Sequence, residues 1–379
     1  MKRGCVIGYD INEKGCQISY YDDSMEEPDT MMASSNNYLI PLVLGYFKDR
    51  WVFGKEAKRL AVVGEDCTET DLYGKAKRRE KVSLAGKTYD AVWLLAKYIS
   101  LTLQDFENIQ YLTFTTPETD VDMAKMLKGI GQHIGVDKEI INVQDYKESF
   151  CQYMIFQPKE LWQYESALFY CDEDRIKAYM LRRLRVDASH GMNSFVTVDE
   201  VANAQRKELE ALYPIMNKEK SPDESFKSMI ENVFEKKVIS SVYLTGEGFE
   251  KNWYPNSLRV LCNGRRAFMG NNLYSKGACY KSIRKCEPND DGPIYLDETK
   301  LTERICLRMR VDGQEGWYPL VTWGTHWYEA DGQWEVLLED ASDIEILVES
   351  LVDEEVQVEK VSLEGLPKRT DYSLRLQVE

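Results

Sequence analysis

Two acidic residues at the tips of predicted hairpins are the first candidates for chemistry. Asp10 ends the apolar strand 4–10, while Asp172 lies in the turn between strands predicted at 168–170 and 176–184. A carboxylate at a strand end can hold a metal-bound water or orient an attacking one. The alternative is that Asp10 only caps its turn, as aspartate commonly does. The repetition of an acidic hairpin indicates an internal repeat in the chain.

A second candidate is the glycine turn of Gly246, Glu247 and Gly248, which follows the apolar strand 238–244. Two glycines one residue apart let the backbone approach a ligand closely, because neither carries a Cβ. A helix predicted at 253–262 completes a strand, turn and helix on which a flat ligand or a phosphate can rest. Most such turns are plain connections, so the pattern equally suits a structural role. Candidate buried positions of that helix are Trp253, Leu258, Leu261 and Cys262.

The other predicted elements position these turns. Apolar residues spaced at three and four positions indicate helices, and β-branched runs bounded by turn residues indicate strands. The polar segment 62–81 is predicted as a solvated face or loop. Further helices are predicted at 89–103, 120–134, 145–157, 198–212 and 226–234, and further strands at 16–21, 38–44, 109–116 and 140–143.

The composition of the chain changes at Glu287, where short alternating runs begin and predict a small β domain, a sandwich with turns at 312–313 and 331–332. Its aromatic residues either line a groove for a protein or peptide partner or fill a small core. The run 373–379 is predicted as an edge strand or as a strand that continues beyond the sequence. The aromatic residues are Trp317, Trp323, Trp327, Tyr328 and Trp334. The predicted domains are 1–164, 165–286 and 287–379.

Charge and length exclude several classes of protein. The 379 residues carry a formal net charge of −16, and an acidic chain argues against a nucleic-acid partner, because phosphates need a basic face. No apolar run reaches about 18 residues, so no membrane span is predicted and we expect a soluble, cytoplasmic protein. Nine cysteines without paired spacing indicate reduced thiols. Three histidines far apart in the sequence provide no visible zinc site.

In the order of its parts, the chain resembles the actin, sugar-kinase and heat-shock-70 ATPase superfamily, and the heat-shock-70 branch most. Gly8-Tyr-Asp10 resembles the first phosphate motif, and Asp172 stands where the second begins. Leu244-Thr-Gly-Glu-Gly248 resembles the adenosine motif. Supporting segments are 38–41, 54–57, 114–117, Glu148-Ser-Phe150 and the helix motif Gly277-Ala278. The resemblance covers residues 4–283 and implies an α/β fold: two ribonuclease-H-like lobes of the actin-like ATPase fold, followed by a small all-β, sandwich-like C-terminal domain. Segments 242–249 and 270–280 also resemble an uncharacterised family of Clostridia-type bacteria.

The resemblance also implies ATP or ADP with Mg as cofactor and a set of site residues. Asp10 and Asp172 would hold the metal through water. Glu148 and Lys77, the latter in the triplet Ala-Lys-Arg, would assist catalysis. The residues implied to bind nucleotide are Asn12, Lys14, Gly15, Gly246, Glu247, Gly248, Phe249 and Gly277. Two simpler interpretations remain open: Lys77 in a solvated basic patch, and Glu148 as an acid favoured in the first turn of a helix.

Both phosphate loops depart from the superfamily pattern. Glu13 stands in the first loop, and the glycines of the second are replaced by Glu173, Asp174 and Arg175. Phosphoryl transfer depends on positioning and charge neutralisation, so we expect weak or absent ATP hydrolysis. The expected function is a heat-shock-70-like nucleotide-binding protein, chaperone-like or binding a protein through its β domain. A pseudo-ATPase scaffold without nucleotide, a sugar-type kinase and a filament-forming actin-like role stay open, and the sequence does not indicate an oligomeric state.

Overall fold

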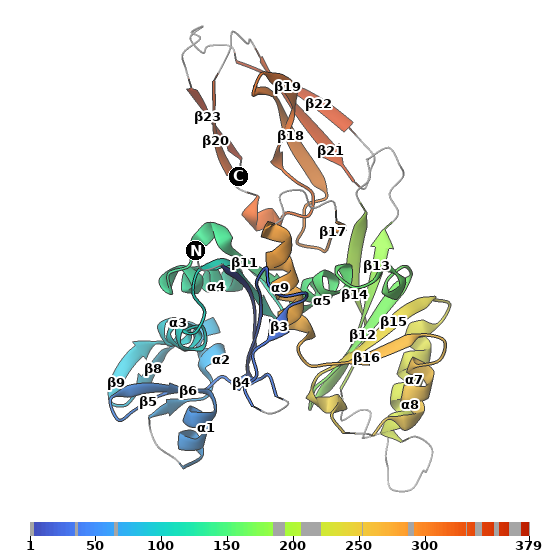
Figure 1. Cartoon of the computed structure of the whole chain (residues 1–379). Coiled ribbons are helices and arrows are strands. Elements are labelled where there is room, and N and C mark those ends of the chain that lie inside the picture. Colours follow the sequence, from blue (N-terminus) through green and yellow to red (C-terminus); the bar gives the residue numbers. More distant parts are fainter. Residues whose placement is uncertain are drawn as a thin grey trace. The chain divides into compact units, whose positions relative to one another are not determined.

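Helices and strands alternate along most of the chain, which has a mixed α/β fold with a small β region at its C-terminal end (Figure 1). The computed structural model describes residues 4–34, 37–63, 67–184, 194–205, 221–251, 253–286, 292–330, 332–337, 343–351, 356–363 and 373–378. The chain divides into two compact units: the larger contains residues 1–182 and 198–290, and the smaller contains residues 183–197 and 291–379. Across the described residues, no helix is long and apolar enough to cross a membrane.

The first sheet of the larger unit has the strand order β11-β10-β1-β2-β3. β1, β10 and β11 run parallel, while β2 pairs antiparallel with β1 and with β3. The predicted strands 4–10, 16–21 and 109–116 are confirmed. The bounds are β1 Cys5–Ile11, β2 Gly15–Tyr21, β3 Asp29–Thr30, β10 Ile109–Thr116 and β11 Ile141–Asp145.

The second sheet repeats this order. Its strands follow one another as β16-β15-β12-β13-β14, so its first hairpin, β12 and β13, stands where β1 and β2 stand in the first sheet. Helices α7 and α8 cover one face and bury Phe226, Phe249 and Leu261. The bounds are β12 Glu165–Cys171, β13 Arg175–Leu184, β14 Phe195–Gln205, α7 Pro222–Phe234, β15 Ile239–Thr245, α8 Pro255–Leu261 and β16 Arg266–Met269.

Helix α9, Leu273–Cys286, lies directly on β1 and crosses α5, Tyr146–Ile155. A Cβ on Gly8 of β1 would lie 2.2 Å from the backbone oxygen of Ser275, and one on Gly277 would lie 2.0 Å from that of Ser149. Glycine at both places therefore lets backbone meet backbone. The hydroxyl of Ser282 donates to the carbonyl of Ile7 at 3.1 Å and ties α9 to the strand.

The opposite face of the first sheet packs against α3, Ala91–Thr102, where Tyr9 meets Thr102 through a 2.8 Å hydrogen bond between their hydroxyl groups. The predicted buried positions of this helix, including Leu94, Leu95 and Tyr98, are confirmed. The remaining elements of this half are β4 Ile40–Pro41, β5 Leu44–Phe47, β6 Arg50–Phe53, α1 Gly54–Val63, β7 Thr68–Glu69, α2 Leu72–Lys77, β8 Lys81–Leu84, β9 Lys87–Asp90, α4 Val121–His133, and the 3-10 turns Lys138–Ile140 and Lys159–Leu161.

The smaller unit is built of β-strands, as predicted for this part of the chain. Four strands pair in the order β19-β18-β21-β22, and β20 pairs with β23. Phe195, Leu296, Trp323 and Leu351 form its small core. The hairpin turn at 312–313 has φ of 49° at its aspartate and 81° at its glycine, as tight hairpins require. The bounds are β17 Ile294–Tyr295, β18 Glu303–Val311, β19 Gln314–Val321, the 3-10 turn Trp327–Glu329, β20 Gly332–Leu337, β21 Asp343–Ser350, β22 Val356–Ser362 and β23 Ser373–Val378.

Several predictions about local structure and burial were wrong. Residues 198–205 continue β14 rather than a helix, because pairing in the sheet overrides the helix propensity of this alanine- and glutamate-containing stretch. The segment 62–81 is not solvated throughout, since α2 buries three side chains. Leu258 and Cys262 are exposed rather than buried. The rest of the helix predicted to 212, the loop 287–291 and the turn residue Asp331 lie outside the described residues.

Candidate functional site

Asn12 closes the tip of the first hairpin with its side chain. Its Oδ1 accepts hydrogen bonds from the backbone amides of Lys14 at 2.9 Å and Gly15 at 3.3 Å. The amide of Asn12 donates to the carbonyl of Gly15 at 3.0 Å. Two of the amides that could face a ligand at this tip are therefore used within the turn.

Asp172 closes the second hairpin in the same way. Its Oδ1 accepts from the amides of Asp174 and Arg175, both at 2.7 Å, and its own amide donates to the carbonyl of Arg175 at 3.0 Å. Asp172 therefore matches Asn12, not Asp10. The strand register supports the same match. Asp10 and Gln17 form the next-to-last residue pair of the first hairpin, and the equivalent pair of the second hairpin is Tyr170 with Lys177.

Asp10 is a buried carboxyl group within β1, with 3% of its surface exposed. The hydroxyl of Tyr146 donates to its Oδ1 at 2.7 Å, and the Nδ2 of Asn12 donates to the same hydroxyl oxygen at 2.9 Å. Burial raises the pKa of Asp10 to about 7, although the hydrogen bond from Tyr146 acts in the opposite direction. Asp10, Asn12 and Tyr146 thus form one connected polar chain.

Tyrosine rings surround this polar chain. Tyr146 stacks on Tyr274 of α9, with ring centroids 3.7 Å apart and planes inclined by 7°, and Tyr170 lies 6.4 Å from Tyr274. Burial raises the pKa of all three phenols, so they are neutral hydrogen-bonding groups at ordinary pH. The buried hydroxyl of Tyr274 has no hydrogen-bond partner among the described residues.

An ion pair joins the first hairpin to the glycine turn: the Nζ of Lys14 contacts Oε1 of Glu247. The two side chains are 48% and 40% exposed, so solvent screens the attraction. These two predicted nucleotide-binding residues therefore bind each other. The pair connects segments from the two sheets of the larger unit.

The glycines of the turn after β15 answer a local packing requirement. Gly246 has φ of 99°, and a Cβ there would lie 2.2 Å from the carbonyl oxygen of Cys171. A Cβ on Gly248 would lie 2.3 Å from the sulfur of the same cysteine. Phe249 is 1% exposed and packs with aromatic rings of the second core, so it is not part of the site.

Glu148 and Gly277 belong to the two helices that cross, α5 and α9. Asp145 caps α5, because its Oδ1 accepts a hydrogen bond from the backbone amide of Glu148 at 2.8 Å. The carboxylate of Glu148 accepts a hydrogen bond from the Nζ of Lys281 at 2.9 Å, and its side chain is 3% exposed. Because Lys281 follows Gly277 by one helical turn, both lie on the face of α9 that meets α5.

Lys77 lies apart from this group. Its side chain is exposed at the end of α2 and forms no hydrogen bond or ion pair with the part of the chain that the structure describes. Among the described residues, no cluster of three histidine, cysteine or acidic side chains could hold a metal ion. Neither Asp10 nor Asp172 therefore belongs to such a cluster of described side chains.

The residues near both hairpin tips do not fit Mg and a phosphate chain. Four backbone amides of the tips are taken by Asn12 and Asp172. Glu13, Glu173 and Asp174 are exposed beside them and would repel phosphate. Sequence reasoning missed Tyr146, Tyr274 and Lys281, although the helical spacing of Lys281 from Gly277 was available as a signal.

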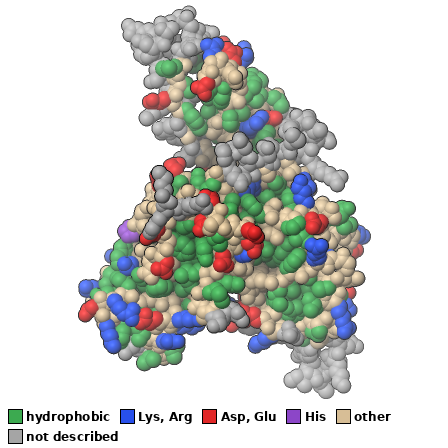
Figure 2. Space-filling view, viewed as in Figure 1, with side chains coloured by type: hydrophobic (Ala, Val, Ile, Leu, Met, Phe, Trp, Pro, Cys, Tyr) green, Lys and Arg blue, Asp and Glu red, His purple; other side chains and the backbone are tan. Residues whose placement is uncertain are grey.

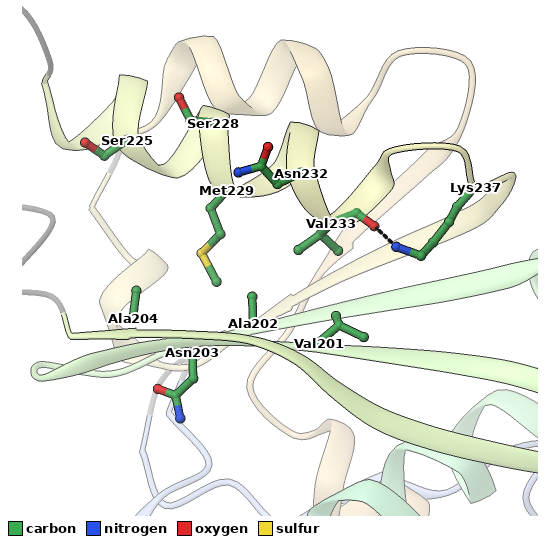
Figure 3. A pocket seen from close by; sticks show the side chains of 10 residues that line it. All are labelled: Val201, Ala202, Asn203, Ala204, Ser225, Ser228, Met229, Asn232, Val233 and Lys237. Carbon is green, nitrogen blue, oxygen red and sulfur yellow. Dashed lines mark hydrogen bonds between the residues drawn. The ribbon is translucent and has the colours of Figure 1, made fainter.

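A separate cavity of about 400 Å³ opens between α7 and β14. Met229 and Val233 of α7 point toward the strand, and the Nζ of Lys237 donates to the carbonyl of Val233 at 2.6 Å (Figure 3). Lys237, the one charged side chain that lines the cavity, is therefore hydrogen bonded to the end of α7. The lining residues are Val201, Ala202, Asn203, Ala204, Ser225, Ser228, Met229, Asn232, Val233 and Lys237.

The larger unit is thus a two-sheet α/β structure joined by crossing helices, with a polar and aromatic group at its hairpin tips. Residues 27–298, more than half of the chain, match the family described as Family of unknown function (DUF5716) C-terminal. The chain belongs to this family. Residues 300–379 match the Domain of unknown function DUF8552. A comparison with curated proteins found no match.

Proposed function

We propose that this chain is a pseudo-ATPase: an actin-like protein of two ribonuclease-H-like lobes, similar to the heat-shock-70 branch, that serves as a protein-binding scaffold without ATP. The repeated strand order of its two sheets supports the fold, because the superfamily it resembles is built of two related lobes. The arrangement of motifs along residues 4–283 supports the branch.

The closing of both hairpin tips by Asn12 and Asp172 carries the proposal. A phosphate would have to replace the side-chain oxygens of Asn12 and Asp172, which already accept hydrogen bonds from four backbone amides. The neighbouring acids make that exchange electrostatically unfavourable. A loop built to receive phosphate would instead leave its amides free for the ligand.

The contacts among Asp10, Tyr146 and Tyr274 support the same conclusion. Tyr146 donates a hydrogen bond to the side chain of Asp10 and stacks on Tyr274 of α9, the helix that also packs against β1. The ion pair of Lys14 with Glu247 adds a further link. Protein side chains, rather than a nucleotide, would hold the two lobes together.

The partner of such a scaffold would be a protein or peptide bound by the C-terminal β region. Trp317 and Trp327 are 38% and 58% exposed, and tryptophan is enriched at protein interfaces. Trp323, by contrast, lies in the small core beneath the guanidinium of Arg304, 4.3 Å from its ring centroid. We place the protein in the cytoplasm, a proposal with which its nine free cysteines agree.

Calorimetric titration with ATP, ADP and AMP, with and without Mg, tests the proposal. We expect no binding up to millimolar concentration, and hydrogen exchange should show the amides of Lys14, Gly15, Asp174 and Arg175 protected equally with and without Mg-ATP. Micromolar ATP binding that Gly246→Val abolishes would overturn it and restore a nucleotide-binding function. A thermal melt of each protein confirms that it is folded.

A further inference from the structure

A hydrophobic groove lies between α8 and the edge strand β16 of the larger unit. Its volume is about 440 Å³. Leu258, Phe268 and Met269 are 42%, 38% and 63% exposed at this groove. Figure 2 shows hydrophobic atoms gathered over this part of the molecule, at the lower right of the view.

The backbone of β16 is open on one side. β16 pairs in parallel with β15, with Ser241 opposite Arg266 and Leu244 opposite Met269. It ends the strand order, so no described strand pairs with its other edge. An open edge beside a hydrophobic groove is the arrangement in which an added strand gains backbone hydrogen bonds and places alternate side chains in the groove.

The two elements that form the groove, α8 and β16, each carry one exposed arginine. Arg259 lies on the stripe of α8 that also presents Pro255 and Cys262, because these positions are three or four residues apart. Arg266 begins β16. Both are exposed, and neither forms an ion pair with a described residue. Free cations here are notable in a chain of net charge −16, and they complement an acidic ligand.

We propose that this groove binds an extended polypeptide segment of alternating hydrophobic and acidic residues, which adds as a strand to β16. Its hydrophobic side chains contact Leu258 and Met269 on the α8 face, and its carboxylates, which point to the other face of the sheet, contact Arg266. Arg259 adds positive charge at the rim of the groove. This proposal does not rest on the pseudo-ATPase function, since nucleotide binding at the hairpin tips would leave β16 and α8 unchanged.

The test uses the full chain and a dansyl-labelled heptapeptide of alternating glutamate and leucine, measured by fluorescence anisotropy. We expect a dissociation constant of about 10–100 μM, typical of a weak peptide interaction. Leu258→Asp and Met269→Asp should each weaken binding at least tenfold. Met32→Asp, at a methionine 57% exposed elsewhere, should leave binding unchanged.

Two further measurements separate the parts of the proposal. A second labelled heptapeptide, of alternating lysine and leucine, should bind the wild type more weakly than the glutamate peptide does. The double variant R259E/R266E should bind the lysine peptide better than the glutamate peptide, reversing the preference. Methylating alternate peptide amides on their hydrogen-bonding edge should abolish binding. No peptide binding below 1 mM, an unchanged charge preference, or equal binding of the methylated peptide would overturn the proposal. If the protein bound dodecanoate but not the peptide, and Leu258→Asp weakened that binding, the proposal would also be overturned, because the groove would then belong to a small amphipathic acid.

Discussion

Asn12 and Asp172 occupy the same place in two different hairpins: each accepts the amides of the residues two and three positions after it. One acceptor is an amide side chain and the other a carboxylate, yet the turns have the same hydrogen bonds. The internal repeat therefore extends from the strand order of the sheets to individual atoms of their turns.

Asn12→Ala should lower the free energy of unfolding by about 1–2 kcal/mol, because it removes an acceptor for two amides and a donor to Tyr146. Urea unfolding at pH 7 measures this. Glu13→Ala, at the exposed neighbour, should change stability by less than about 0.5 kcal/mol. Equal effects of the two substitutions would contradict the role of Asn12 in closing the turn.

Asp10 should make stability depend on pH. Its pKa of about 7 in the folded protein exceeds the value of about 3.9 expected when unfolded, so the folded state binds more protons between these values. Stability should therefore fall as pH rises from about 4 to about 7, by at most about 1.4 kcal/mol per pH unit, and then level off. The measurement is urea unfolding of the wild type and Asp10→Asn at pH 5, 6, 7 and 8.

The stability of Asp10→Asn relative to wild type should rise across this range and level off above pH 7. Tyr146→Phe should extend the fall to higher pH, because the hydrogen bond from Tyr146 lowers the pKa of Asp10. A constant difference between wild type and Asp10→Asn would show that Asp10 does not titrate between pH 5 and 8.

Lys281→Met should destabilise the protein by about 3 kcal/mol, because it removes an ion pair with the buried carboxylate of Glu148. The same substitution at Lys276 of α9 is the control, since its ionic partner Glu27 is 73% exposed and remains hydrated. Thermal unfolding compares the two. If Lys276→Met costs as much, the loss reflects the aliphatic part of lysine, not the buried pair.

Gly277→Ala should cost about 3 kcal/mol, because a methyl group 2.0 Å from the backbone oxygen of Ser149 forces α5 and α9 apart. Gly129→Ala is a matched change in α4, where a Cβ meets nothing within 4 Å. Helix propensity should make that variant more stable by up to about 1 kcal/mol. Both free energies come from denaturant unfolding, and a mild effect at Gly277 would show that the helices can separate at little cost.

The larger elements could be predicted because their hydrophobic spacing agrees with their burial. The strand 109–116, which ends before Pro117, and the helix around Leu94 and Leu95, which Asp90 caps, are examples. The stretch 198–205 could not be, because its residues favour a helix locally while a neighbouring strand decides its conformation.

The candidate site was less accessible to sequence reasoning. Hairpins and glycine turns are visible in the sequence, but hydrogen bonding across the tips is not, so the sequence pairs Asp172 with Asp10 whereas the structure pairs it with Asn12. The stacking of Tyr146 on Tyr274 joins residues far apart in the chain, and no local pattern marks it.

The contact of Gly8 with α9 has a consequence for the order of events during synthesis. Ser282 bonds to the carbonyl of Ile7 across 275 positions of sequence, so the first strand is made long before the helix that covers it. The part of that face which α9 covers stays open until residue 286 has left the ribosome. Such distant contacts slow folding, and a nascent chain halted before α9 would expose its oldest strand to chaperones and proteases.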